Sequence, residues 1–153
     1  MANEIRTKTD TPVAITMSLA GLANGVARQS TLFVNTNSRP AAKITLRIKS
    51  NANPPADGSL IEVYLIQSDD TVNSDGAGET DAVIVCENAI RLGTIVVTAT
   101  ADKNFYGIFD TANVTQCLGP KAGIIVKNVT GQSFSAIEAD HYKTVMFYVP
   151  EIQ

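Results

Sequence analysis

The sequence contains no tryptophan, two cysteines and one histidine, and each scarcity narrows what the chain can do. Two thiols cannot form a dense disulfide framework, and we expect Cys86 and Cys117 to stay reduced because no signal peptide is recognisable. An aromatic content of 6% leaves little surface on which sugars could stack. These scarcities argue against a disulfide-rich secreted module and against a carbohydrate-binding one.

Long apolar runs and an excess of positive charge are also missing. No run approaches the ~18 apolar residues that a membrane span needs, and residues 1–11 lack the apolar stretch of a signal peptide. The net charge of −3 disfavours binding through phosphate contacts. We therefore expect no membrane and no nucleic-acid partner. The strip of Lys43, Arg47 and Lys49 is expected to be a solvated sheet face or a contact with an acidic protein surface.

Apolar and polar residues alternate along most of the chain, as in β-strands whose two faces differ. The clearest case is residues 41–49, in which Ile44, Leu46 and Ile48 share one face. Turns rich in Gly, Pro, Asn and Asp separate the predicted strands, which are residues 12–19, 30–35, 41–49, 59–67, 94–99, 104–109, 123–128 and 143–149, with residues 82–86 as a further candidate. The pattern predicts an all-β fold, an antiparallel, jelly-roll-like β-sandwich of about eight strands.

The chain shows neither an internal repeat nor a linker. We predict one β-sandwich domain over residues 12–153, preceded by a polar N-terminal arm over residues 1–11. Residues 19–26 also have helical spacing, but they include Gly21 and Gly25, and each glycine costs about 1 kcal/mol in a helix interior. We expect a loop there.

The acidic stretch from Asp69 to Asp81 is the nearest approach to a metal site. The calcium-loop pattern fails there at both ends, because Thr71 occupies the first ligand position and Ala82 the twelfth. A surface loop is expected, and an irregular calcium site stays open as the alternative. Zinc has no Cys-x-x-Cys or His pair to bind. We name no metal and no cofactor.

Catalytic signals are weak. A hydrolase triad would have to use His141, and the nearest approach to a nucleophile elbow, residues 131–135, lacks the closing glycine. A glycosidase needs two facing carboxylates, and the sequence cannot place any two together among Glu62, Glu79, Glu138 and Asp140. We predict that the protein is not an enzyme and name no catalytic residue.

Several predicted strands carry apolar residues on both faces. The residues on the second face are Tyr64, Ile66, Val96, Ile125, Met146 and Tyr148. An antiparallel sandwich usually exposes one face of each sheet to water, so something is expected to cover these residues. The cover is either the chain's own loops or a neighbouring subunit, and the sequence leaves both open. A closed, symmetric homo-oligomer, guessed to be a trimer, is the expected form of the second alternative.

Two stretches of the chain resemble small structural proteins of tailed bacteriophages. The first contains Leu22-Ala23-Asn24-Gly25, then Ala27-Arg28-Gln29-Ser30, the strand of residues 41–49 and residues 58–65; the second is residues 123–131. The likeness spans much of residues 19–67 and 123–131. The matching motifs are strand and turn sequences and do not define a site, so no contact residue can be transferred.

The resemblance implies a non-enzymatic virion protein, in the first place a capsid decoration (cement) protein. Such a protein sits as a homo-oligomer, commonly a homotrimer, on the outer capsid surface, where it binds the major capsid protein and stabilises the shell. Residues 1–11 would be the polar arm that lies along the shell. The alternatives are a tail, neck or fibre-base component of the virion, and a binding module for carbohydrate or a host surface.

Overall fold

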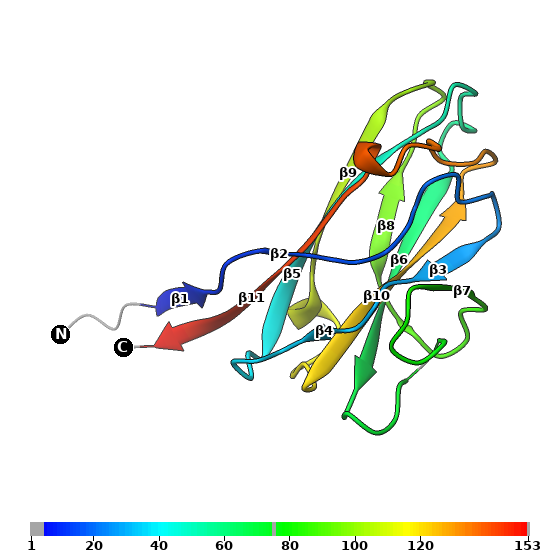
Figure 1. Ribbon diagram of the computed structural model, residues 1–153. Coiled ribbons are helices and arrows are strands. Elements are labelled where there is room, and N and C mark those ends of the chain that lie inside the picture. Colours follow the sequence, from blue (N-terminus) through cyan, green and yellow to red (C-terminus); the bar gives the residue numbers. More distant parts are fainter. Residues whose placement is uncertain (1–4, 75, 153) are drawn as a thin grey trace.

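The computed structural model describes residues 5–74 and 76–152, which form two antiparallel sheets packed face to face (Figure 1). Sheet A has the order β1-β11-β5-β9, with β2 also paired to β11. Its strands are β1 (Ile5–Thr9), β2 (Val13–Ala14), β5 (Ala41–Lys49), β9 (Asn104–Asp110) and β11 (Tyr142–Ile152). Sheet B has the order β7-β3-β10-β6-β8, with β4 also paired to β10. Its strands are β3 (Ala27–Gln29), β4 (Phe33–Val34), β6 (Leu60–Ser68), β7 (Ala82–Ile84), β8 (Ile90–Val96) and β10 (Lys121–Val129).

The strand order is that of a jelly roll. β1 and β2 lie on the same side of β11, opposite β5, and so form one interrupted edge strand. β3 and β4 likewise share the side of β10 opposite β6. With each pair taken as one strand, the two layers read β1/β2-β11-β5-β9 and β3/β4-β10-β6-β8. Apart from β6 and β8, which pair within sheet B, successive strands alternate between the layers, as in a jelly roll. The all-β, jelly-roll-like sandwich is confirmed. The described residues form eleven strands because two edges are interrupted and β7 is added.

The first predicted strand, residues 12–19, is shorter than expected. Only Val13 and Ala14 join the ladder beside β11. The chain then moves toward sheet B, where the Thr16 carbonyl accepts a hydrogen bond from the Thr31 amide at 2.9 Å. The side chains still alternate, and Ile15 is buried in the core. Residues 15–19 therefore close one side of the sandwich without belonging to either sheet. Residues 19–26 form the expected loop.

The main core lies between the sheets and uses the predicted faces. It includes Ile44, Leu46 and Ile48 of β5, which are all fully buried. β8 and β9 are the last strands of their sheets, and Gly93 of β8 and Gly107 of β9 allow these two strands to approach each other closely. A Cβ at Gly107 would lie 2.8 Å from the side chain of Ile95 on β8. Burial of these inward faces from water supplies most of the driving force for packing the two sheets.

A second, smaller core lies on the outer face of sheet B. Ala27, Ile66 and Ile125 are buried there, beside β7, which pairs with β3 at the edge of the sheet, and against the segment that follows β7. The residues packed against them are Tyr64, Ile84, Cys86 and Ala89. The chain itself therefore covers the part of this face around Ile66 and Ile125, whereas Val96, on the same face, stays exposed. For sheet B the alternatives left open by the sequence are decided only in the covered part. Cys86 and Cys117 form no disulfide, as expected.

Residues 5–9 of the predicted arm form β1, which pairs with the C-terminal part of β11. In Figure 1 these two segments project together beyond the body of the sandwich, close to both ends of the chain. Residues 1–4 of the arm lie outside the described residues. That the arm contacts a capsid shell stays a prediction.

Candidate interaction surface

The outer face of sheet A is open, in contrast to that of sheet B. The strand registers place its side chains in rows across β11, β5 and β9, with Tyr142, Arg47 and Tyr106 in one row. The next row contains Thr144 of β11, Thr45 of β5 and Ile108 of β9. Tyr106 is 67%, Ile108 73% and Tyr142 48% exposed. We call this surface the A face and define it by Lys43, Thr45, Arg47, Tyr106, Ile108, Tyr142, Thr144 and Met146.

The A face carries two cations, Arg47 and Lys43, that form no ion pair within the described residues, although Asp110 lies beside Lys43 in the strand register. Arg47 lies between two tyrosines in its row, and its Nε is buried without a hydrogen-bond partner in the described part of the chain. The Lys43 Nζ lies 5.6 Å from the centre of the Tyr148 ring. Lys49, the third residue of the predicted strip, pairs with Asp140 at 3.2 Å. Arg47 is thus the cation of the strip that is available for a carboxylate of another molecule.

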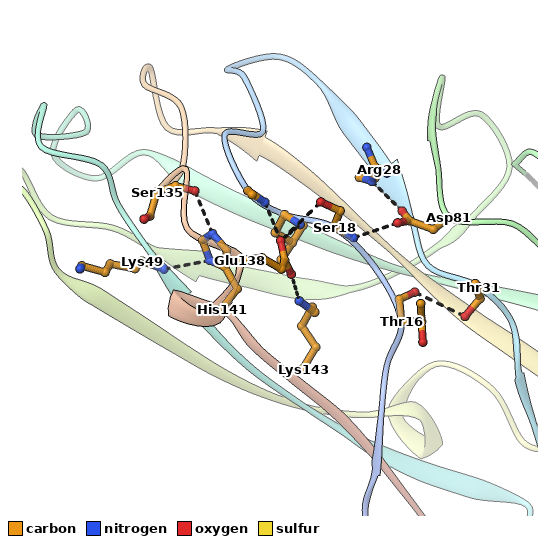
Figure 2. A network of polar contacts seen from close by, with 12 residues as sticks. Thr16, Ser18, Arg28, Thr31, Lys49, Asp81, Ser135, Glu138, His141 and Lys143 are labelled. Atoms are coloured by element: carbon orange, nitrogen blue, oxygen red, sulfur yellow. Dashed lines mark hydrogen bonds and ion pairs between the residues drawn. The ribbon is translucent and has the colours of Figure 1, made fainter.

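A polar network occupies the end of the sandwich where β11 begins (Figure 2). Oε2 of Glu138, in the short 3-10 helix η2 (Glu138–Asp140), accepts hydrogen bonds from the amides of Leu19 and Ala20 at 2.7 and 2.8 Å. Its Oε1 pairs with the almost completely buried Lys143. Burial raises the pKa of Glu138, but Lys143 and the two amides outweigh burial and hold the pKa below its usual value. The network joins β11 to the loop that closes the sandwich.

His141 lies beside this network, and both of its ring nitrogens face backbone groups (Figure 2). Nε2 lies 3.1 Å from the carbonyl oxygen of Ser135, and Nδ1 accepts from the Lys49 amide at 3.4 Å. Burial lowers the pKa of the imidazole. The Ser135 hydroxyl donates to Asp140 at 2.6 Å and does not bond the ring. The geometry gives His141 a structural role and forms no Ser–His pair. That the protein is not an enzyme stays a prediction.

The acidic stretch of residues 69–81 binds the protein's own donors. Asp69 Oδ1 accepts from the amides of residues 71 and 72 at 2.9 and 2.7 Å, which lowers the pKa of Asp69. Asp70 and Glu79 both pair with Lys121, at 3.1 and 2.6 Å. Asp75 lies outside the described residues. In the described ranges no three His, Cys, Asp or Glu side chains gather as metal ligands, so nothing supports the calcium alternative.

Asp81, at the end of this stretch, joins it to the sandwich (Figure 2). Its Oδ1 accepts from Arg28 Nε at 2.6 Å, and its Oδ2 from the Ser18 amide at 3.0 Å. These contacts join the acidic loop to β3 and to the segment that closes the sandwich. They fix the start of β7, which leads into the segment packed against the second core.

Sequence reasoning found the cations of the A face but missed its two most exposed apolar residues. Residues 104–109 were predicted as a strand, yet Tyr106 and Ile108 were not among the residues noted on a second face. The sequence carried a signal for this second apolar face, because Phe105 and Phe109 alternate with Tyr106 and Ile108. The structure buries the two phenylalanines and so turns Tyr106 and Ile108 outward. Of the residues that were noted, Val96 is 63% exposed, whereas Ile66 and Ile125 are fully buried.

The chain matches no protein-family model, and no curated protein matches it. Over residues 5–74 and 76–152 no helix is long and apolar enough to cross a membrane. The fold therefore defines the class, an antiparallel β-sandwich of jelly-roll order in which the chain itself covers part of the outer face of sheet B and leaves that of sheet A open.

Proposed function

We propose that this protein is a non-enzymatic structural protein of a tailed-bacteriophage virion, and within the virion a capsid decoration (cement) protein on the outer head surface. The A face is the observation that carries the proposal. It presents exposed Tyr106, Ile108 and Tyr142 beside an arginine without an acidic partner in the described chain. Tyrosine and arginine are enriched where proteins bind one another. A sheet face also suits a protein surface better than a small ligand, which needs a concave site.

The partner is the major capsid protein, and its contact surface supplies carboxylates. Arg47 can bind a carboxylate through both terminal nitrogens, because its Nε alone is buried. β1 extends the same sheet beyond the body of the sandwich and so lengthens the surface that could lie on a shell. Each contact of this kind is modest. Many symmetry-related copies on a head would bind cooperatively through avidity, which is how a cement protein stabilises a shell.

The jelly-roll fold is compatible with this proposal but does not by itself favour it over other functions. Jelly rolls serve as viral capsid domains, but also as lectins and cupins. Function therefore has to be argued from the surface and not from the strand order. The A face is open along its whole width, whereas the chain covers part of the outer face of sheet B, so the A face is the broader side of the sandwich for docking.

Binding to assembled heads of the phage that encodes this protein tests the proposal. Purified wild-type protein should sediment with heads, and Arg47→Gln together with Tyr106→Ser should weaken binding at least tenfold, or about 1.4 kcal/mol. Lys127→Gln is the matched control. It neutralises a half-exposed cation on sheet B, next to Glu62 instead of on the A face, and should bind like wild type. Raised salt should slow association, because the A face is cationic.

Electron microscopy of intact particles separates the proposal from its alternatives. Copies spread over the whole head support a decoration protein. Copies confined to one vertex or to the tail identify a tail, neck or fibre-base component. Binding to glycans without binding to heads identifies a carbohydrate or host-surface module. Head binding that the A-face variants leave unchanged would remove the A face from the proposal.

A further inference from the structure

β9 is an open edge of sheet A. It pairs with β5 alone. The Ser50 amide donates to the carbonyl of Lys103, the residue opposite it, at 3.0 Å, and this bond shows which opposed pairs of the ladder are hydrogen-bonded. Hydrogen-bonded and non-hydrogen-bonded pairs alternate along an antiparallel ladder. Phe105, Gly107 and Phe109 therefore bond β5. The N–H and C=O groups of the intervening residues point away from the sheet, where no described residue accepts or donates to them.

The edge lacks the features that usually prevent strand pairing. Edge strands are commonly protected by proline, lysine, a bulge or a covering segment. β9 has the sequence Asn-Phe-Tyr-Gly-Ile-Phe-Asp, with no proline and no cation, and its pairing with β5 is regular over all seven residues. β8, the neighbouring edge of sheet B, differs. Its ladder is shifted between Val63 and Tyr64, and its Arg91 pairs with Glu62.

We infer that β9 pairs antiparallel with β9 of a second copy of this chain, about a twofold axis at Gly107. In this register Tyr106 faces Ile108 of the second copy, and these are the residues whose backbone groups point outward. Phe105 faces Phe109, and Asn104 faces Asp110, so no like charges meet. All seven residues find a partner, whereas a shift of two residues in either direction leaves an end of the strand unpaired and places Gly107 opposite a phenylalanine.

The neighbouring strand adds complementary charge. In the strand register, Asn104 lies beside Lys49 of β5 at one end of β9, and Asp110 lies beside Lys43 of β5 at the other end. Across the twofold axis each Asp110 would face the neutral Asn104 of the other copy, with Lys49 beyond it, so no two carboxylates meet. The glycine at the axis puts no side chain where the two strands come closest. A strand that is self-complementary in size, charge and hydrogen-bonding phase selects a second copy over an unrelated strand.

The pairing joins the two A faces into one continuous sheet surface. It is isologous and yields an assembly with an even number of copies, in contrast to the homotrimer that the family resemblance implies. It stands on the geometry of β9 and is independent of the proposed function, because a twofold pair forms whether or not the protein binds a head.

Sedimentation and hydrogen exchange test the pairing on the full-length protein. Wild type should change from monomer to dimer as its concentration rises. In the dimer the amides of Tyr106 and Ile108 should become protected from exchange, while those of Phe105, Gly107 and Phe109 are already protected in the monomer. Ile108→Pro removes one outward N–H and no bond to β5, so the sheet should persist while dimerisation weakens at least tenfold. Ile108→Ala keeps the N–H and should retain the dimer.

A protein that stays monomeric, or a trimer that tolerates Ile108→Pro, would overturn the inference. So would equal exchange of the Tyr106 and Ile108 amides at low and high concentration. The exchange measurement uses wild type and stays decisive if Ile108→Pro does not fold. A third outcome would also count against edge pairing. If Ile108→Ala loses the dimer too, and the Tyr106 and Ile108 amides of the wild-type dimer stay unprotected, the two copies contact each other through side chains of the A face and not through the backbone of β9. Head binding measured separately shows whether the proposed function survives either result.

Discussion

The Tyr148 hydroxyl lies 2.8 and 2.7 Å from the two carboxylate oxygens of Asp110. The bond joins β11 to β9 across β5, because both side chains lie on the outer face of sheet A. Burial, and next the hydrogen bond to Asp110, raise the pKa of Tyr148 to about 12. Tyr64, on sheet B, reaches a pKa of about 12 in the same way, through burial and its hydrogen bond to Glu62.

Alkaline unfolding should report this bond. A tyrosine whose folded pKa exceeds its usual value of about 10 stabilises the fold fully below pH 10, and the contribution is lost as the pH rises toward 12. Tyr148→Phe should lower the free energy of unfolding by about 1 kcal/mol at pH 7 and flatten the loss above pH 10. Urea unfolding from pH 7 to 11.5 measures both. Tyr106→Phe, which removes an exposed hydroxyl, should change neither, and an unchanged slope in Tyr148→Phe would contradict the prediction.

Glu138→Gln should destabilise the fold by about 2 kcal/mol at neutral pH, because it leaves the buried ammonium of Lys143 without its counter-charge. The folded pKa of Glu138 lies below its usual value, so its contribution is present above about pH 4.5 and is lost as the pH falls through the folded pKa. The difference between wild type and variant, measured by denaturant unfolding, should therefore shrink toward pH 3. Glu79→Gln, whose partner Lys121 is on the surface, is the control and should unfold close to wild type. Equal losses in both variants would refute the assigned role of Glu138.

His141 is the only histidine, so its titration can be followed by NMR without ambiguity. Burial lowers its pKa, and we expect a midpoint below 6.5 in the folded protein and a neutral ring that carries its proton on Nε2, the nitrogen facing the Ser135 carbonyl. Since the folded pKa is depressed, this group stabilises the fold above pH 6.5 and loses that contribution as the pH falls. The same resonance in urea should titrate near 6.5. A folded midpoint at or above the unfolded one would show that the ring is solvated.

The cover over sheet B should contribute as a genuine core. Ile125→Ala should lower the free energy of unfolding by about 2–4 kcal/mol, because Ile125 is fully buried beneath the segment around β7. Val96→Ala is the matched control on the same outer face, where Val96 is 63% exposed, and should change stability by about 0.5 kcal/mol or less. Thermal and urea unfolding measure both. Similar small effects in the two variants would mean that the cover opens in solution.

Local patterns predicted the fold well where one face of a strand was clearly apolar. Ile44, Leu46 and Ile48 point into the core as expected, because side chains alternate along any strand whatever its neighbours are. The loop at residues 19–26 followed from Gly21 and Gly25, which both adopt positive φ. The segment of residues 12–19 was harder. Its alternation persists, but only Val13 and Ala14 pair with β11, and the chain then leaves sheet A and bonds Thr31 between β3 and β4.

The sequence alone determined that this chain is all-β and which side chains of its clearest strands face the interior, since alternation is a property of neighbouring residues. The strand order that makes the sandwich a jelly roll came from the tertiary structure. Only the tertiary structure decided that Ile125 is covered while Ile108 is open, and that the backbone groups of Lys49 and Ser135 occupy both nitrogens of His141. These outcomes depend on contacts between residues far apart in the chain. Such contacts follow from how the sheets stack, which residue type and local spacing do not encode.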